Sequence, residues 1–283
     1  MNSVANGKVR TQTPFEDIYV QPAASDNGTA LGAAYFVWHQ RLGKPRAFVM
    51  NHALWGTAYD DCDIASLLDG NVDANAVKVL RFDAPDTPGA IDEMCRVTAR
   101  LIADGNVVGW FQGRMEWGAR ALGNRSILAD PRRADMRDLI NLRIKFREKF
   151  RPFAPSILEG AVGDYFVDPA ADPFMQQVYP VRENKRNILP AITHVDGTGR
   201  LQTVNEMQNP LYYRLIREFE RITGVPALLN TSFNENEPIV DTPAQALACF
   251  LRTRMDALVV GNTILIRQTQ ATEIAPDLMK SAF

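Results

Sequence analysis

Apolar runs alternate with amphipathic stretches along most of the chain. The runs at 76–82, 107–113 and 225–230 have the length of single buried strands and are followed by polar or turn-forming residues. The stretches at 89–106 and 211–224 repeat apolar residues at helical spacing and reach a glycine near their ends. Strands that alternate with helices in this way predict an α/β fold built in layers.

Two further helix starts place a capping residue directly before proline. Asp130–Pro131 predicts a helix with Asp130 as its N-cap, because Met136, Ile140 and Ile144 then recur at helical spacing. This predicted helix has an apolar face that becomes basic toward its end. Residues 241–253 repeat the same start, so we expect a second helix of this kind there.

The segments near the two ends of the chain also have recognisable patterns. Residues 17–20, "DIYV", are strand-like, and an Ala-rich apolar segment that begins at Asp26 predicts a buried helix. Small residues such as Gly28 at its opening would let a ligand approach the backbone N–H groups, although a tight turn explains them equally well. Near the other end, apolar runs on both sides of Gly261–Asn262 predict a hairpin.

A proline-rich break follows the strand predicted at 76–82. We place a domain boundary between about residues 70 and 90, and assign residues 1–80 and 81–283 to two domains. The length of 283 residues is sufficient for two domains of ordinary size.

The composition is typical of a soluble globular protein. Hydrophobic residues make up 46% of the chain and charged residues 23%, which argues against extensive disorder. No apolar run is long enough to span a membrane, and the N-terminal residues lack the apolar core of a secretory signal, so we expect a cytoplasmic protein. The cysteines, Cys62, Cys95 and Cys249, are widely spaced, which favours free thiols over disulfides or a zinc site.

Charge is distributed unevenly, although the net charge is only −2. Residues 111–151 contain eleven basic and five acidic side chains, a local excess of +6, so the remainder carries −8. Three explanations are open: a solvated helix face, a nucleic-acid patch, or a pocket for a small anion. We expect Arg132, Arg133 and Arg137 to lie on a solvated face. The segment contains neither a P-loop nor a GxGxxG motif.

Within this segment, arginines and glycines follow a predicted strand directly. Arg114, Arg120 and Arg125 alternate with glycines, an arrangement typical of phosphate sites in α/β proteins. Arg151 precedes a proline, which stiffens the backbone and fixes the position of its charge. Elsewhere, "NTSFN" at 230–234 ends a predicted strand, and its amide and hydroxyl groups suit a small amide-like substrate or simply a turn.

Five separated motifs resemble a known family. These are the opening "NSVANGK", then "VQPAASDNGTALGAA", "GRMEWGARALGNRSILADPR", "REKFRPFAPSIL" and "NTSFNENEPIV". They are similar to the C-terminal half of the NodU/CmcH-type O-carbamoyltransferases, which carbamoylate hydroxyl groups of antibiotics and nodulation factors. The resemblance extends over nearly the whole chain.

The resemblance implies a fold and an activity. Residues 81–283 would form a YrdC-like α/β domain with a mixed, twisted sheet, and residues 1–80 the C-terminal remnant of an actin-like and sugar-kinase-like (ASKHA) ATPase domain. The YrdC-like domain would convert carbamoyl phosphate and ATP into carbamoyl adenylate, and the ATPase-like domain would pass the carbamoyl group to a hydroxyl acceptor. The acceptor itself cannot be read from this chain.

The resemblance also assigns roles to individual residues. Arg120 and Arg151 would be catalytic, because they offset charge while the adenylate forms. The residues expected to bind carbamoyl phosphate or the adenylate are Lys145, Arg200, Asn230 and Ser232. In the basic run around Lys145, we expect Lys145 and Arg151 to face a pocket and Arg143 and Lys149 to face solvent, while Arg147 could do either.

The family's metal site matches this chain at one position only. Asp26 corresponds to one carboxylate ligand of the iron or other divalent metal, but no HxxxH motif is present, and His39, His52 and His194 are isolated. We therefore expect that a separate ATPase-like subunit supplies the rest, or that the chain is a fragment or the product of a decayed gene. Two other interpretations stay open: an RNA-binding relative linked to tRNA threonylcarbamoylation, and a catalytically silent partner subunit.

Overall fold

The computed structural model describes residues 2–82, 89–148 and 151–268. Its main feature is an eight-stranded sheet with the strand order β1-β10-β9-β2-β3-β8-β4-β7. The pairs β2–β9 and β4–β7 are parallel and the other neighbours are antiparallel, so the sheet is mixed. The strands are β1 (Val77–Arg81), β2 (Val108–Phe111), β3 (Arg125–Ala129), β4 (Ala154–Leu158), β7 (Gln202–Val204), β8 (Ala227–Ser232), β9 (Ala257–Val260) and β10 (Thr263–Arg267).

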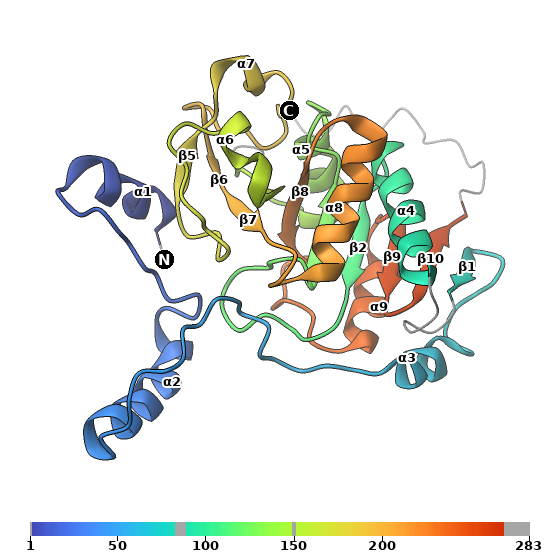
Figure 1. Cartoon of the computed structure of the whole chain (residues 1–283). Coiled ribbons are helices and arrows are strands. Elements are labelled where there is room, and N and C mark those ends of the chain that lie inside the picture. Colours follow the sequence, from blue (N-terminus) through green and yellow to red (C-terminus); the bar gives the residue numbers. More distant parts are fainter. Residues whose placement is uncertain (1, 83–88, 149–150, 269–283) are drawn as a thin grey trace.

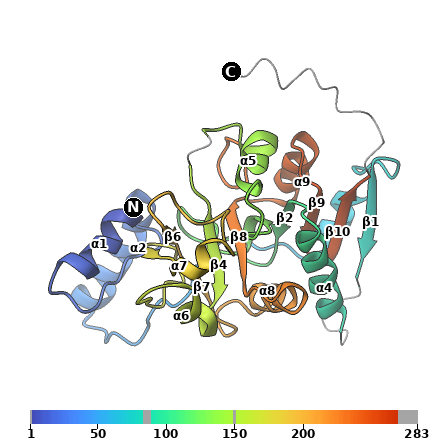
Figure 2. The ribbon, with the colours of Figure 1, turned by 90° about the horizontal axis from the view of Figure 1, so that it is seen from above.

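Helices cover both faces of this sheet (Figure 2). The helices α4 (Ala90–Ala103) and α8 (Pro210–Thr223) pack together on one face, and α5 (Met136–Ile140) and α9 (Pro243–Arg252) lie on the other. Trp110, Phe219 and Phe250 are fully buried between these layers. The α/β class with a mixed sheet is therefore confirmed, and the core belongs to the sheet and its two helix layers.

Smaller elements complete the chain. Beside β4 and β7 lies a two-stranded sheet of β5 (Val178–Pro180) and β6 (Thr198–Arg200), with short helices around it. These are η3 (Glu159–Ala161), α6 (Val162–Tyr165) and α7 (Glu183–Arg186), while the π-helical turn η2 (Asn141–Lys145) extends α5. The N-terminal elements are α1 (Ser3–Gln12), α2 (Asp26–Phe36), the π-helical turn η1 (Val37–Arg41) and α3 (Asp61–Leu68).

Most predicted elements are present where the pattern placed them. The three strands expected from the apolar runs are β1, β2 and β8, and the hairpin is β9–β10. Gly224 ends α8 in the left-handed region with φ +73°, as its position predicted. Thr242 caps α9 in a full capping box with Gln245, so the cap-then-proline signal is confirmed there.

The helix predicted to begin at Asp130 begins six residues later. The buried Asp130 carboxylate instead accepts hydrogen bonds from the backbone N–H and the guanidinium of Arg132, each at 2.9 Å. The backbone bond is the one that an N-cap accepts from the second helical residue, but residues 131–135 form turns and no helix follows it directly. The helical spacing is confirmed only from Met136 onward.

Two expectations for the N-terminal residues were wrong. Residues 17–20 are not a strand, since no segment of the described residues pairs with them. The helix α2 forms at Asp26 as predicted, but none of its residues is buried, and it projects from the sheet and its helices (Figure 1). Gly28 has a structural reason, because an added Cβ would come within 2.2 Å of the Ala23 carbonyl oxygen.

The predicted domain boundary falls at the end of β1. This strand pairs with β10 over its whole length, from Val77 with Arg267 to Arg81 with Thr263. Residues 77–81 are therefore the edge strand of the main sheet. The division at residues 80 and 81 stays a prediction.

Candidate active site

Four arginines surround a cavity of about 290 Å³ at one side of the sheet. They come from separate parts of the chain: the loop between β2 and β3, the segment before β4, and the end of β6. No carboxylate belongs to the lining among the residues that the structure describes, so the cavity is strongly positive. The lining residues are Ala119, Arg120, Ala121, Arg147, Arg151, Pro152, Met175, Arg200, Asn230, Thr231 and Ser232.

Arg120 and Arg200 form the buried part of this positive lining. The Nε atoms of both are buried and have no hydrogen-bond partner among the described residues. Burial lowers the pKa of Arg120, and it lowers the pKa of Arg200 to about 9, with further lowering by the charges of Arg120 and Arg147. Arginine stays charged at neutral pH even so, and repelling buried charges destabilise the site until an anion compensates them.

Arg147 and Arg151 form the more open part. Arg147 stacks over the Phe153 ring at 4.7 Å and its Nε donates to Asn141 Oδ1 at 3.0 Å, which fixes its position. Burial and the neighbouring charge of Arg151 lower the pKa of Arg147. Arg151 is 55% exposed and pairs with Glu148 at 3.1 Å, so its guanidinium can exchange that partner for an incoming anion.

Asn230 contributes a fixed amide to the cavity. Its side chain is almost fully buried at the end of β8, and Nδ2 donates to Ser156 Oγ and Gln202 Oε1, both at 3.0 Å, and to Ala121 O at 3.2 Å. These acceptors fix the amide nitrogen as the donor and leave Oδ1 without a partner in the described structure. A buried, unpaired carbonyl oxygen is costly, and a ligand N–H group would satisfy it.

Ser156 and Gln202 hold the Asn230 amide in place, and sequence reasoning missed both of them. They face each other across β4 and β7, and Ser156 Oγ donates to Gln202 Oε1 at 2.5 Å. Gln202 Nε2 in turn donates to the Leu122 carbonyl at 2.8 Å, which connects this network to the loop that carries Arg120. No spacing along the chain signals this, because the three strands that meet here are far apart in sequence.

Lys145 lies behind the cavity wall and does not line it, contrary to expectation. Its buried ammonium donates to the Ser232 carbonyl, the Asn234 carbonyl and Asn234 Oδ1, each at 2.6 Å. Burial lowers the pKa of Lys145 to about 7. Ser232 Oγ donates to Asn234 Oδ1 at 2.8 Å and remains part of the lining, so Lys145 positions Ser232 from below.

The arginines that follow β2 have different roles from one another. Only Arg120 reaches the cavity. Arg125 is fully buried, stacks over Phe111 at 3.6 Å and donates to backbone carbonyls, including Gln112 O at 2.7 Å. Arg114 donates to the Gly56 carbonyl at 3.0 Å. Grouping all three as a phosphate site was wrong, because two of them hold the loop by satisfying carbonyl groups.

A buried glutamate organises the loop that presents Arg120. Glu116 Oε1 accepts the backbone N–H groups of Leu122 at 2.6 Å and Asn124 at 2.8 Å. The Glu116 carboxylate therefore stabilises the loop that contains Arg120. These hydrogen bonds restrict the position of the Arg120 guanidinium. The only signal in the sequence was an isolated acid among arginines and glycines.

The rest of the basic segment is not an exposed patch. Arg143 is 37% exposed and lies 3.6 Å from Asp256, and Arg133 pairs with Asp135. Arg132 was expected in solvent, but it pairs with the buried Asp130 and stacks over Phe219. Arg137 is half-buried, and its Nε lies in the interior. Lys149 lies outside the described residues. This distribution argues against a nucleic-acid surface along the described part of the segment.

The metal expectation rests on Asp26 alone. Asp26 is exposed in the first turn of α2. Among the residues that the structure describes, no three His, Cys, Asp or Glu side chains lie close enough to hold a metal ion. The donor set present does not fit the family's metal, so no metal-dependent step is derived from this chain.

The remaining expectations concern membranes and thiols. Within the described ranges, no helix is sufficiently long and apolar to cross a membrane. Cys62, Cys95 and Cys249 are free, as predicted, with Cys95 and Cys249 buried. Burial raises the pKa of both buried thiols to about 12, so neither is a reactive thiolate at neutral pH.

Comparison with known proteins gives the family. The model described as "Carbamoyltransferase C-terminus" matches residues 99–267, and "Carbamoyltransferase N-terminus" matches residues 1–35. The chain belongs to the carbamoyltransferase family. The resemblance found in the five motifs is thereby confirmed.

Among curated proteins, nodulation protein NolNO of Sinorhizobium fredii is 46% identical over 96% of this chain and 39% of its own length. The 3'-hydroxymethylcephem-O-carbamoyltransferase of Amycolatopsis lactamdurans is 35% identical over 88% of this chain and 44% of its own length. The chain thus spans less than half the length of these relatives.

Solved structures show weaker similarity. The structure of full-length HypF in its phosphate- and nucleotide-bound form overlaps 68% of this chain and 22% of its own, with 15% identity and a TM-score of 0.41. The structure of P. abyssi Sua5 complexed with L-threonine overlaps 60% of this chain and 47% of its own, with 14% identity and a TM-score of 0.44.

Proposed function

We propose that the chain is the carbamoyl-activating half of an O-carbamoyltransferase, and that the arginine cavity binds carbamoyl phosphate and the phosphates of ATP to form carbamoyl adenylate. The observation that carries the proposal is the cluster of Arg120, Arg147, Arg151 and Arg200 without a carboxylate in the described lining. Two anionic substrates that react with each other need such a concentration of positive charge. Membership of the carbamoyltransferase family supports the same reaction class.

The cavity also offers groups for the uncharged end of carbamoyl phosphate. The unpaired Asn230 Oδ1 can accept a hydrogen bond from the carbamoyl NH₂, and Ser232 Oγ, whose proton is donated to Asn234 Oδ1, can accept a second one. The hydrogen bonds of Asn230 Nδ2 hold Oδ1 in one orientation before the ligand arrives. This preorganisation favours a small amide over a bare phosphate.

The bonds that form and break during adenylate formation indicate the role of the arginines. When carbamoyl adenylate forms, a carbamoyl oxygen bonds the α-phosphorus of ATP and pyrophosphate leaves. The phosphate of carbamoyl phosphate is released as well, so one water molecule is consumed. Negative charge therefore grows on two leaving groups, and Arg120 and Arg200 inside the cavity, with Arg151 at its open side, would stabilise it.

Exchange of labelled pyrophosphate into ATP tests this proposal. We expect exchange that depends on carbamoyl phosphate and falls at least 100-fold in Arg151→Ala, the usual scale for losing one charge-stabilising group. Arg143→Ala is the matched control, because Arg143 comes from the same basic run, pairs with Asp256 and does not line the cavity. Wild-type exchange in Arg151→Ala would refute the site assignment, and no exchange in the wild type would refute the activity.

The complete transfer needs more than this chain. Since the chain spans between 38% and 48% of the length of its curated relatives, we propose that carbamoylation of a hydroxyl acceptor takes place with the remaining part of such a protein, in the same polypeptide or as a separate subunit. An antibiotic or a nodulation factor is the acceptor class that the names of the relatives suggest.

A further inference from the structure

A second hollow lies at the edge of the main sheet where β2 and β9 end. These two strands are parallel, and β8, which ends at the arginine cavity, runs in the same direction. The hollow has a volume of about 350 Å³, which is within the range of small-molecule sites, and such sites in α/β proteins lie beyond the carboxyl ends of parallel strands. No described residue lines both this hollow and the arginine cavity. We call it the β2–β9 hollow, and its lining includes Asp60, Asp61, Phe111, Gln112 and Gly261.

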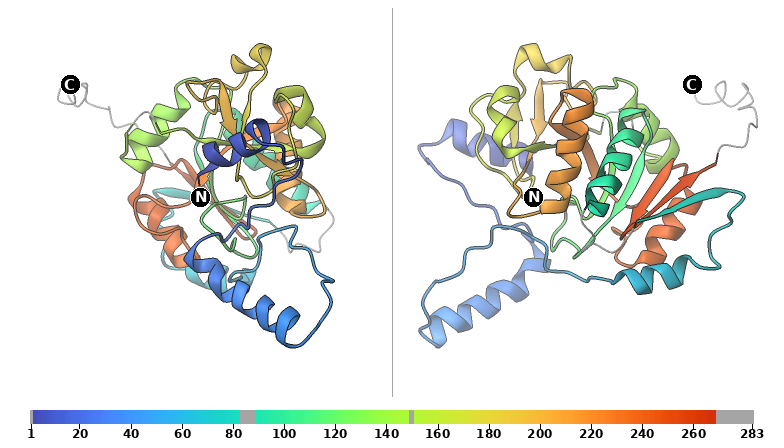
Figure 3. Two further views of the ribbon diagram at one scale, coloured as in Figure 1. Left: turned by 90° about the vertical axis from the view of Figure 1, so that its left-hand side faces the viewer. Right: turned by 45° about the vertical axis from the view of Figure 1, so that its right-hand side comes forward.

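Elements from distant parts of the chain surround the β2–β9 hollow. The first turns of α3 and α4 and the turn between β9 and β10 contribute to its lining. These elements gather on the side of the molecule away from α1 and α2 (Figures 1 and 3). An added Cβ at Gly261 would come within 2.6 Å of Asp61 Oδ1, so the first turn of α3 lies directly against the β9–β10 turn. The hollow is therefore formed by tertiary contacts between packed elements.

Gln112 contributes a fixed hydrogen-bond acceptor to this hollow. The residue is only 6% exposed, its backbone N–H donates to the Asn124 carbonyl at 2.9 Å, and its own carbonyl accepts from Arg125 at 2.7 Å. Its side-chain Nε2 donates to the Gly261 carbonyl at 2.9 Å, which sets the orientation of the amide. The remaining polar atom, Oε1, accepts no hydrogen bond from the described residues, and the side chain lines the hollow. A buried amide oxygen of this kind requires an N–H or O–H donor.

Two carboxylates make the β2–β9 hollow negative. Asp60 is exposed and Asp61 is half-buried, and neither forms an ion pair within the described part of the chain. No lysine or arginine belongs to the lining among the residues that the structure describes. The Asp61 carboxylate lies against the same turn whose carbonyl holds the Gln112 amide, so a charged acceptor and a neutral one converge there. This potential is opposite in sign to that of the arginine cavity.

The interior of the hollow is largely apolar and aromatic. The rings of Tyr59 and Phe111 lie 6.2 Å apart at an angle of 45°. Arg125 stacks over Phe111 but does not line the hollow, and the carboxylates of Glu116 and Asp241 act on its charge. The half-buried ring of Tyr59 is part of the lining, and aromatic rings attract organic cations.

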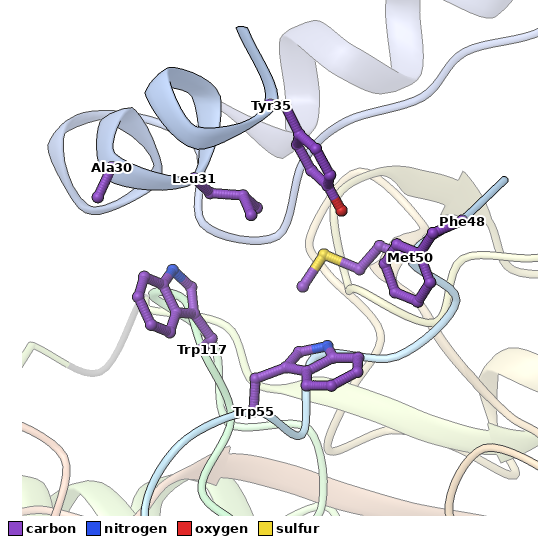
Figure 4. Close-up of a pocket in the computed structure, with 7 residues that line it drawn as sticks. All are labelled: Ala30, Leu31, Tyr35, Phe48, Met50, Trp55 and Trp117. Atoms are coloured by element: carbon purple, nitrogen blue, oxygen red, sulfur yellow. The ribbon is translucent and has the colours of Figure 1, made fainter. Parts of the chain in front are cut away.

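A larger hollow of about 450 Å³ beside α2 provides a contrast (Figure 4). Leu31 and Tyr35 form one side of it, and Met50, Trp55 and Trp117 face them across the gap. Its described lining contains no charged side chain, so charge does not select a ligand there. The β2–β9 hollow combines an apolar interior with convergent polar groups, which is the composition typical of small-molecule sites.

We propose that the β2–β9 hollow is a second binding site, which takes a small organic cation with an ammonium group on an apolar body. The ammonium group binds the Asp61 carboxylate and Gln112 Oε1, and Asp60 adds negative charge at the exposed side. The apolar body packs against Tyr59 and Met94. An ammonium group supplies both the N–H donors and the positive charge that these acceptors need, whereas a phosphate-bearing ligand would be repelled. The inference does not depend on the proposed activation of carbamoyl phosphate.

Titration of the whole chain with 2-phenylethylammonium, followed by NMR, tests the proposal. Neutral 2-phenylethanol and anionic 3-phenylpropionate have similar apolar bodies and differ in charge. We expect saturable binding of the ammonium with a Kd of about 1 mM or lower, and binding of the other two that is about tenfold weaker or more. The amide signals of Gln112 and Gly261 should shift during the titration, because both residues line the hollow. Absence of saturable ammonium binding, or equal binding of the anion, would overturn the proposal.

Isosteric variants locate the contacts of the ammonium group. Asp61→Asn removes a charge and Gln112→Met removes an acceptor, and each should weaken binding about fivefold or more. Asp60→Asn should have a smaller effect of about twofold, because Asp60 is more exposed, and asparagine can still cap α3 by accepting the Asp63 N–H. The matched control is Asp104→Asn, which alters an exposed acid at the other end of α4 and should leave the Kd unchanged. Equal weakening by Asp61→Asn and Asp104→Asn would contradict a defined site.

A double variant with Arg120→Met and Arg200→Met separates the two sites. Both arginines line the arginine cavity and neither lines the β2–β9 hollow, so the variant should bind 2-phenylethylammonium with the wild-type Kd. Loss of ammonium binding in this variant would place the cation elsewhere and refute the assignment. Pyrophosphate exchange is measured independently, so its failure would refute the proposed activity and leave this binding site standing.

Discussion

The residues before and after position 60 differ in how far their side chains are buried. Among residues 2–60, only Pro22, Ala23 and Ala53 are buried. From residue 61 to 268, the described segments build the main sheet, with a layer of helices on each face and a continuous core between them. The two regions contain similar patterns of strand and helix signals, so the difference lies in whether a partner element is present. The helix α2 forms without burying a residue, so the pattern predicts the element, and burial depends on whether another element covers it.

Truncation of a large apolar side chain should give the largest difference between the two regions, measured as a loss of unfolding free energy. Phe219→Ala, in a fully buried position of α8, is expected to cost about 3–5 kcal/mol of unfolding free energy. Phe36→Ala, on the exposed side of α2, should change it by about 0.5 kcal/mol or less in the chain alone. Urea unfolding of both variants makes this measurement. Equal costs would mean that the N-terminal residues belong to the same cooperative unit.

The arginine cavity should be important for activity and unimportant for folding. Arg200→Met removes a largely buried cation that other arginines repel, so we expect pyrophosphate exchange to fall about 100-fold or more while unfolding free energy stays equal or rises. Arg133→Met, whose charge pairs with Asp135 near the surface, is the control that should retain activity. Loss of folding in Arg200→Met alone would show that this arginine has a structural role.

Anion binding should stabilise the residues around the cavity without affecting those before residue 60. At a phosphate concentration 100 times its Kd, the unfolding free energy should rise by about 2.7 kcal/mol. Thermal unfolding in phosphate, compared with chloride at equal ionic strength, measures this change. The gain should disappear in a variant that carries both Arg120→Met and Arg200→Met, because both line the cavity. A gain that persists in that variant would place the anion elsewhere.

Lys145 should give the folded state a pH dependence. Burial lowers its pKa from 10.5 to about 7 in the folded state, so between these values the unfolded state binds more protons. The unfolding free energy should therefore rise with pH across that window, by at most about 1.4 kcal/mol per pH unit, and the cost of the buried charge is fully present below pH 7. Comparing wild type with Lys145→Met from pH 7 to 9 isolates this slope. Identical slopes would contradict the lowered pKa.

Sequence reasoning located the helices and strands better than it located their ends. The capping box of Thr242 and Gln245 fixed the start of α9, since both partners are local. Asp130 carries the same kind of signal, but its carboxylate binds the Arg132 side chain two residues on. Asp130 also accepts the backbone N–H of Arg132, so a local capping bond alone does not start a helix where the following residues form turns.

Only some of the residues that line the cavity could be predicted from the sequence. Arg120, Arg151, Arg200, Asn230 and Ser232 were expected in one pocket, and all five line the same cavity, although their chemical roles stay proposals. Lys145 was expected in the pocket and lies behind its wall, and Arg147 was left open and lines it, because the π-helical turn η2 after α5 changes the direction in which successive side chains point.

The family, the α/β class and the clustering of basic residues follow from the amino-acid sequence alone, because these depend on local pattern and on motifs. Only the tertiary structure showed that Arg125 holds a loop while Arg120 faces a cavity, and that Asn230 keeps its carbonyl oxygen free. It also showed that the apolar N-terminal helix is uncovered. These outcomes depend on contacts between residues far apart in the chain, and the burial and charge of a side chain follow from what surrounds it in space.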